Sequence, residues 1–183
     1  MVTITQSFCS YFEKLEALYR TAFGTAPTVA YTDALNKTLL ISEPNEEGEV
    51  QWKPIKQGFE IDWNSIEAEL GFKLCQELKE YYSTYYFLSL NGSFGNCDLY
   101  FYPIDGSKQI SQIVMQNYKD AQYVFPDTQL FLIGNAVVDD NDNYFIYYDN
   151  STGKLFCHES ETGKQILLSY SIAKTISSME VSL

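Results

Sequence analysis

The chain has 183 residues, of which 45% are hydrophobic and 16% aromatic. This length and composition predict one globular domain over residues 1–183 with a large core, and they differ from the polar compositions of disordered proteins. The net charge of −12, with Arg20 as the only arginine, argues against nucleic acid and anionic membrane surfaces as partners. The same charge would attract a basic protein. Alternatively, the acidity only keeps the chain soluble.

The cysteines show neither C-x-x-C pairs nor metal-ligand spacing. We therefore interpret all four as small buried hydrophobes in a reduced compartment, namely Cys9, Cys75, Cys97 and Cys157. The first twenty residues lack the basic start and apolar run of a secretory signal, and nowhere do eighteen apolar residues follow one another. We expect a cytoplasmic protein with no cofactor, no metal and no direct membrane insertion. The oligomeric state stays open.

The N-terminal third combines one helix with an irregular segment. Apolar residues recur at spacings of three and four from Phe8 to Phe23, which predicts a helix ending at Gly24. Further on, short apolar runs at residues 38–41 and 50–52 flank an acidic turn at residues 43–49. This pattern predicts either a hairpin or a pair of edge strands.

Two short amphipathic helices follow, separated by one glycine. Asn64 or Ser65 can cap the first helix, and Gly71 supplies the left-handed residue that ends it. The second helix resumes near Leu74, with apolar residues at helical spacing as far as Tyr85.

The rest of the chain reads mostly as strands separated by turns. The expected strands are Tyr86 to Leu90, Cys97 to Tyr102, Leu130 to Val138, Tyr144 to Tyr148, Lys154 to His158 and, at an edge, Ile166 to Leu168. Residues 91–96 should form a loop and Gly153 a tight turn, while residues 110–118 and 171–179 should be helical. This order predicts a single α+β domain with a mainly antiparallel sheet and helices packed on it.

His158 is the only histidine, so no multi-histidine metal site can form. Its neighbour Cys157 should point to the opposite face of a strand, which excludes a catalytic dyad by adjacency. We therefore expect a solvent-facing histidine. The phosphate-binding, dinucleotide-binding and serine-hydrolase glycine motifs are absent from the sequence, so no catalytic residue is predicted. An enzyme that uses scattered carboxylates remains a separate alternative.

The acidic run at residues 139–143 invites a calcium interpretation because carboxylates and amides are hard-cation ligands. The spacing fails, since Tyr144 and Asn150 fall where the calcium loop needs its glycine and its bidentate glutamate. A solvated turn between two strands and a partner contact are the remaining interpretations.

The predicted partner-binding site combines acidic residues with aromatic anchors. Its residues are Glu43, Glu46, Glu47, Glu49, Trp52, Asp139, Asp140, Asp142, Tyr144 and Tyr147. We expect the acidic residues to cluster on one face, and strand alternation should make Tyr147 and Tyr148 point in opposite directions.

Several motifs in order resemble the SUKH superfamily, and its Syd branch in particular. They are E-x-x-L-G at 67–71, E-L-x-x-Y-Y at 77–82 with the apolar segment and Asn91-Gly92 after it, W-x-P at 52–54, F-L-I-G at 131–134, F-I-Y-Y at 145–148 and D-N-S-T-G at 149–153. The resemblance covers Trp52 to the C-terminus. None of these motifs is a catalytic signature.

The resemblance implies an α+β binding protein that is not an enzyme, and most directly an immunity protein that neutralises a cognate bacterial toxin. The alternative that it implies is a Syd-type protein that meets basic cytoplasmic loops of the SecY channel, with a peripheral location at the inner membrane. Both roles need a basic protein partner.

Overall fold

A computed structural model describes residues 2–182 and confirms a single α+β domain. Seven strands form one curled antiparallel sheet in the order β10-β9-β8-β7-β6-β5-β11. Their bounds are β5 Asn91–Phe94, β6 Cys97–Phe101, β7 Leu130–Val138, β8 Asn141–Asp149, β9 Leu155–Glu159, β10 Gln165–Ser169 and β11 Glu180–Val181. The helices of the described residues are α1 Ile4–Phe23, α2 Trp63–Leu70, α3 Gln76–Ser83, α4 Ile110–Gln122 and α5 Ile172–Ser178.

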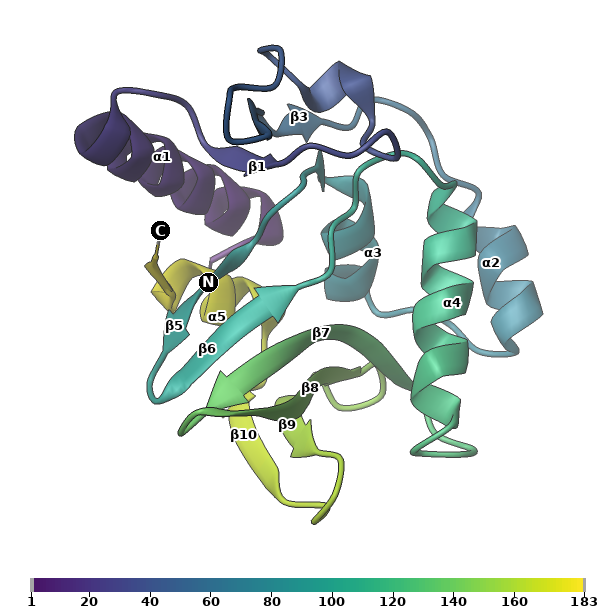
Figure 1. Cartoon of the computed structure of the whole chain (residues 1–183). Helices are drawn as coiled ribbons and strands as arrows, with labels where there is room; N and C mark the ends of the chain where they lie inside the picture. Colours follow the sequence, from purple (N-terminus) through teal and green to yellow (C-terminus); the bar gives the residue numbers. More distant parts are fainter. Residues whose placement is uncertain (1, 183) are drawn as a thin grey trace.

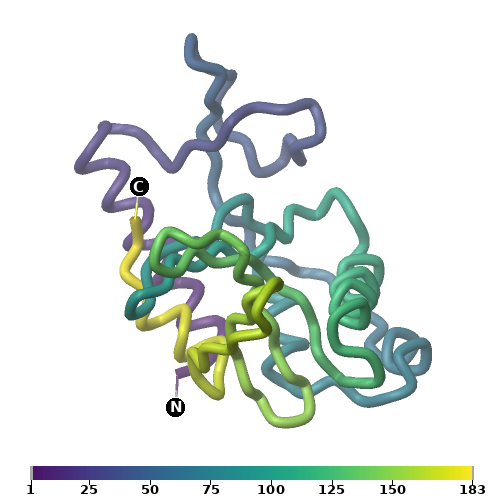
Figure 2. The backbone as a smooth tube through the Cα atoms, turned by 60° about the horizontal axis from the view of Figure 1, so that its bottom comes forward, coloured from purple at the N-terminus to yellow at the C-terminus, as the bar shows by residue number. Residues whose placement is uncertain are grey.

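A small unit at residues 25–57, here called the N-terminal β unit, stands at one end of the molecule (Figures 1 and 2). It contains β1 Thr28–Ala30, the 3₁₀ helix η1 Lys37–Leu39, β2 Glu49–Gln51 and β3 Ile55–Lys56. Strands β1 and β2 pair with each other, and β3 pairs with β4 Tyr85–Tyr86. The expected pairing of residues 38–41 with 50–52 is reduced to one bridge, between Leu40 and Trp52.

Helix α1 begins at Ile4, four residues before the first residue of the predicted pattern, Phe8. Thr3 and Gln6 form a capping box at this end, which satisfies two backbone N–H groups. It ends at Gly24 as predicted, with a φ of 72°. Helix α2 ends at Gly71, also as predicted, but its N-cap is Asp62 rather than Asn64 or Ser65. The Asp62 carboxylate accepts from the backbone N–H of Ser65 at 3.2 Å and from its hydroxyl at 2.6 Å.

The predicted strand from Tyr86 to Leu90 is wrong, because the sheet strand begins at Asn91, in the segment expected to be a loop. Gly92 lies inside β5 rather than in a turn. A Cβ atom at Gly92 would come within 2.4 Å of the carbonyl oxygen of Glu180, so glycine allows β11 to approach and pair. The turn falls at Gly95 instead, with a φ of 63°.

The main core lies between the sheet and helices α1, α3 and α5, of which α5 lies next to β5 in Figure 1. Helix α4 packs along the start of β7. A second, smaller core cluster on the other side of the sheet joins Ala121 at the end of α4 to Leu130, Tyr147 and Phe156, with Phe125 packed against it. Among residues 2–182, no helix is long and apolar enough to span a membrane.

Candidate protein-binding surface

The acidic members of the predicted site divide into two separate surfaces. Glu49 begins β2 in the N-terminal β unit at the top of Figure 1, whereas the turn between β7 and β8 lies at the lower left. The two acidic segments therefore lie apart in the fold, and the clustering of the acidic residues on one face stays a prediction. The sequence could not place the two segments relative to each other, because they belong to different parts of the fold.

The acidic turn of the N-terminal β unit is held by a single side chain. Asn45 Oδ1 accepts from the backbone N–H of Glu47 at 3.0 Å and of Glu49 at 2.8 Å. Glu43, Glu46 and Glu47 are exposed and Glu49 is half-buried. Within the described chain, none of these carboxylates lies within ion-pair distance of a lysine or arginine.

The second acidic segment is a tight two-residue turn. Asp139 and Asp140 have φ values of 50° and 62°. Aspartate tolerates this left-handed conformation, and a two-residue hairpin turn of this kind requires it at both positions. Both are exposed, as is Asp142, the second residue of β8. None of the three forms an ion pair with another described residue. Across residues 2–182, no group of three histidine, cysteine or acidic side chains could hold a metal ion.

The aromatic members of the predicted site are buried, so none of them presents its ring to solvent. Trp52 is 0%, Tyr144 4% and Tyr147 2% exposed. Strand β8 is flanked by β7 and β9 and is covered on both faces, Tyr144 and Tyr148 facing the main core and Tyr147 the smaller cluster. Tyr147 and Tyr148 do point in opposite directions, but neither direction leads to solvent.

Phe125, in the loop after α4, is the residue that covers this part of the sheet. Its ring lies 5.0 Å from that of Tyr147 and 4.8 Å from that of His158, edge to face in both cases. His158 is consequently buried, and the expectation of a solvent-facing histidine is wrong. Burial lowers the pKa of His158, so its neutral form is favoured in the folded protein. Cys157 faces the main core on the other side of the sheet, as alternation predicts.

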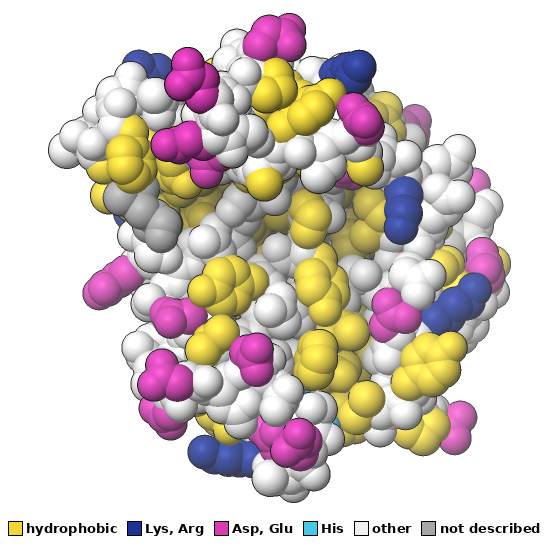
Figure 3. All heavy atoms as spheres, viewed as in Figure 1, with side chains coloured by type: hydrophobic (Ala, Val, Ile, Leu, Met, Phe, Trp, Pro, Cys, Tyr) yellow, Lys and Arg dark blue, Asp and Glu magenta, His cyan; other side chains and the backbone are white. Residues whose placement is uncertain are grey.

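The side of the sheet that Phe125 covers is open to solvent farther along, where neither Phe125 nor α4 reaches. We call this region the outer sheet face and define it by Asp98, Tyr100, Asn135, Val137 and Phe145. The register places Asp98 opposite Val137, and Asn135 between Tyr100 and Phe145. Tyr100 is 41% exposed, Asp98 is exposed, and the other three are half-buried. Over β6 and β7, Figure 3 shows hydrophobic side chains beside acidic ones.

The β7–β8 turn continues this face at its acidic end. Asp98 pairs with Val137 and Cys97 with Val138, so Asp139 follows directly after the last residue pair of β6 and β7. Burial first, and then the charges of Tyr102 and Asp120, raise the pKa of the neighbouring Tyr147 to about 12. The outer sheet face is therefore an apolar strip with exposed acidic groups at the end next to the β7–β8 turn.

Sequence reasoning missed Asp98, Tyr100, Val137 and Phe145 as surface residues. A signal was present in the sequence of β6, where Asp98 and Tyr100 alternate with apolar residues, and burial in the structure follows the same alternation. The corresponding residues of β7 and β8 gave no such signal, because those strands are apolar on both faces.

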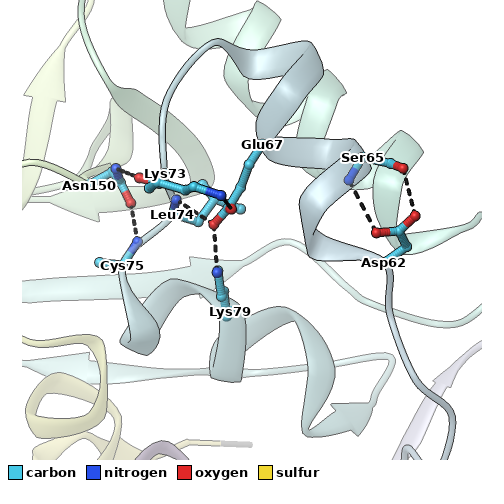
Figure 4. A network of polar contacts seen from close by, with 8 residues as sticks. All are labelled: Asp62, Ser65, Glu67, Lys73, Leu74, Cys75, Lys79 and Asn150. Carbon is cyan, nitrogen blue, oxygen red and sulfur yellow. Dashed lines mark hydrogen bonds and ion pairs between the residues drawn. The ribbon is translucent and has the colours of Figure 1, made fainter.

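The first of the family motifs stabilises the contact between α2 and α3. Glu67 of E-x-x-L-G is buried and accepts from Lys73 Nζ at 2.7 Å, Lys79 Nζ at 2.5 Å and the backbone N–H of Leu74 at 3.0 Å (Figure 4). These bonds, that from Lys73 first, lower the pKa of Glu67 to about 2. The carboxylate thus ties the end of one helix to the next, an architectural role.

The D-N-S-T-G motif holds the β8–β9 turn against the segment that joins α2 to α3. Asn150 Oδ1 accepts from the backbone N–H of Cys75 at 2.7 Å, and its Nδ2 donates to Lys73 O and Gln129 Oε1, both at 2.9 Å (Figure 4 shows the first two bonds). Gly153 completes the turn with a φ of 74°, as predicted. Both motifs therefore position the sheet and leave the outer sheet face free.

Comparison with known proteins gives two overlapping family matches. The model of the SMI1 / KNR4 family (SUKH-1) matches residues 60–178, and that of the Syd protein family (SUKH-2) matches residues 5–102. A search of curated protein sequences gave no significant match. The Syd match lies in the N-terminal half, while the C-terminal motifs fall within the SMI1 / KNR4 match alone. Because each model matches more than half of the chain and both families are SUKH families, the chain belongs to the SUKH superfamily.

Proposed function

We propose that this protein is a cytoplasmic, non-enzymatic immunity protein that binds and neutralises a cognate bacterial toxin. SUKH-superfamily domains are known as immunity proteins or as Syd-like binding proteins, and both roles involve a protein partner. The motifs E-x-x-L-G and D-N-S-T-G support a binding role, because the side chains of Glu67 and Asn150 form hydrogen bonds and ion pairs within the fold. Neither presents a reactive group to a substrate.

The observation that carries the proposal is the outer sheet face with its acidic end. Tyr100, Val137 and Phe145 offer apolar contact area in the middle of the sheet, and Asp98 and the β7–β8 turn add exposed negative charge. Protein interfaces combine such parts, since apolar and aromatic anchors slow dissociation while charge steers association.

The charge of the whole protein supports a basic partner. A net charge of −12 would repel acidic proteins and attract a toxin whose active surface is basic. Toxins that act on nucleic acid need such a surface for their substrate. A protein bound there would block the substrate without catalysing any reaction.

Co-expression with the toxin encoded beside this gene tests the proposal. Cells should survive toxin induction when they contain this protein, and the purified proteins should form a stable complex that a Tyr100→Asp variant weakens. A matched Tyr170→Asp variant, at a residue 66% exposed outside the outer sheet face, should protect fully. Failure of the wild-type protein to bind or protect against the neighbouring toxin would contradict the immunity role.

A second function, that of a Syd-type partner of the SecY channel, is favoured by the Syd family match over residues 5–102. The acidic turn of the N-terminal β unit lies within that segment and could meet basic cytoplasmic loops of the channel at the inner membrane. Binding to purified channel in lipid nanodiscs tests this role. A Glu43→Gln, Glu46→Gln, Glu47→Gln variant should then bind more weakly, and equal binding would argue against it.

A further inference from the structure

A pocket of about 300 Å³ lies among α3, α4 and residues 102–109, the segment that joins β6 to α4 (Figure 1). We call it the α4 pocket. Tyr82 borders it from α3, Tyr102 from the joining segment, and Asn117 and Asp120 from α4. Its volume is at the lower end of the range of small-molecule sites, in which a few polar groups orient the ligand. The α4 pocket therefore suits a ligand of only a few heavy atoms.

Asn117 brings an unpaired hydrogen-bond acceptor to the α4 pocket. The residue is 9% exposed, and its Nδ2 donates to the hydroxyl of Tyr82 at 2.8 Å, which fixes the orientation of the amide. Its Oδ1 accepts no hydrogen bond from another described residue. This oxygen is not among the fully buried polar atoms without a partner, so it retains accessible surface, and Asn117 borders the α4 pocket. Buried polar side chains are rarely left unpaired, so the oxygen points to a donor that the described chain does not supply.

Asp120 adds a negative charge one helical turn from Asn117, on the same side of α4. Its Oδ1 accepts from Gln116 Nε2 at 2.7 Å, whereas its Oδ2 has no partner among the described residues. The second carboxylate of the pocket is that of Asp105, and neither carboxylate forms an ion pair within the described chain. The exposed Lys108 contributes one positive charge, so the pocket keeps an excess of negative charge.

The unpaired oxygens and the negative charge select a cationic hydrogen-bond donor. A primary ammonium group carries three N–H donors and no acceptor, and its bonds to a carboxylate are charge-assisted. An anion would be repelled by the excess negative charge. A metal ion fits less well, because residues 2–182 contain no group of three histidine, cysteine or acidic side chains that could hold one.

The other walls of the α4 pocket suit an alkyl stem attached to that ammonium group. Tyr102, Pro103 and Ile113 border the pocket, and Tyr102 and Ile113 are half-buried. The ring of a tyrosine attracts a cation that lies against its face. Burial first, and then the charge of Asp120, raise the pKa of Tyr102, so its phenol stays neutral at physiological pH.

We propose that the α4 pocket binds an alkylammonium group, whose N–H donors bond to Asn117 Oδ1 and to the Asp120 carboxylate while its alkyl stem lies against Tyr102 and Ile113. Two sources share this chemistry, namely a free aliphatic amine and a lysine side chain of another protein. The pocket shares no residue with the outer sheet face, so the proposal does not depend on the proposed toxin-binding function.

Nuclear magnetic resonance of the ¹⁵N-labelled protein tests the proposal directly. The probes are pentylammonium for the free amine and Nα-acetyl-lysine N-methylamide for the lysine side chain, at constant pH and ionic strength. We expect the side-chain amide signal of Asn117 to shift in a saturable manner at low-millimolar concentration with at least one of them. Saturation by pentylammonium alone identifies a free amine as the source, and saturation by the lysine derivative identifies a lysine side chain. The matched neutral probe, 1-pentanol, should bind about tenfold more weakly than pentylammonium.

Two variants separate the charge of the pocket from the unpaired oxygen. Asp120→Asn keeps the size of the side chain and an acceptor for Gln116, and should weaken pentylammonium binding about tenfold. The matched control Glu161→Gln removes one negative charge at an exposed position in the β9–β10 turn, and should leave the affinity unchanged. Asn117→Leu removes the unpaired oxygen and should also weaken binding about tenfold. Thermal unfolding checks that each variant is folded.

The outcomes are decisive even if Asn117→Leu fails to fold, because Asp120→Asn tests the pocket with Asn117 and Tyr82 in place. The proposal would be overturned if neither amine shifts the Asn117 signal in a saturable manner, or if 1-pentanol binds as tightly as pentylammonium. Equal affinity of Asp120→Asn and the wild type for pentylammonium, or of a folded Asn117→Leu variant, would overturn it as well.

Discussion

The triple substitution Asp139→Asn, Asp140→Asn, Asp142→Asn should slow association with a basic toxin. All three side chains are exposed and have no ion-pair partner within the described chain, so their field reaches an approaching protein. Asparagine tolerates φ values of 50° and 62° at least as well as aspartate, so the turn should keep its shape. The change therefore removes charge with little effect on the fold.

The size of the effect follows from Coulomb's law and screening. At about 6 Å, two unit charges interact by about 0.7 kcal/mol in water, and screening over about 8 Å roughly halves this at physiological salt. Three such charges contribute about 1 kcal/mol, which corresponds to a roughly fivefold slower association. At about 0.01 M salt the screening length is about 30 Å, and the same estimate gives roughly 15- to 20-fold.

Stopped-flow or surface binding kinetics against the purified toxin would measure this change, with the dissociation rate recorded in the same experiment. The matched control is Glu43→Gln, Glu46→Gln, Glu47→Gln, which changes the net charge equally but lies in the N-terminal β unit, away from the outer sheet face. Equal slowing by both variants would mean that only net charge matters. An unchanged association rate in the aspartate variant, at low and high salt, would refute the reasoning.

Three further predictions address the surface, the sheet and acid stability. Tyr100→Ala should speed dissociation of the toxin about tenfold or more, for a loss of about 1.4 kcal/mol, while Tyr170→Ala should leave the rate unchanged; equal rates would remove Tyr100 from the interface. Gly92→Ala should lower the unfolding free energy in urea by about 1–3 kcal/mol because the new Cβ meets Glu180 O at 2.4 Å, and Gly58→Ala, with open space around it, should not. Since the folded pKa of Glu67 is about 2, below its ordinary value of 4.5, its stabilising contribution is complete above pH 4.5 and is lost as the pH falls towards 2. A Glu67→Gln variant should therefore lose less stability than the wild type between these pH values, and parallel losses would contradict the assignment.

Much of the fold could be predicted because the signals were local. Gly24, Gly71 and Gly153 each adopt the left-handed conformation that the sequence suggested. The first two end helices α1 and α2, and Gly153 lies in the turn between β8 and β9, as expected. The edge position of β10 was also predictable from its short apolar run near the C-terminus. In all these cases the residues that fix the conformation are close to one another in sequence.

The errors arose where distant segments decide the structure. Asn91-Gly92 has the composition of a turn, but it forms a strand because β11, at the far end of the chain, pairs with it. Likewise, Tyr144 and Tyr147 follow closely after an acidic turn in the sequence, but one faces the main core and the other lies under Phe125. Nothing near these residues in sequence indicates that cover.

The same distinction separates what family membership predicts from what it leaves open. Glu67 and Asn150 belong to motifs that carry the resemblance. Both form hydrogen bonds that connect helices and turns within the domain. Of the outer sheet face, Phe145 belongs to the F-I-Y-Y motif, whereas the other four residues belong to none of these motifs, namely Asp98, Tyr100, Asn135 and Val137. A change at a motif residue disturbs the scaffold, whereas a change on the outer sheet face alters the contact surface and leaves the hydrogen bonds of the scaffold intact. In the proposed immunity role, the outward-facing side chains of β6, β7 and β8 would therefore select the partner, and the family motifs leave most of these side chains unspecified.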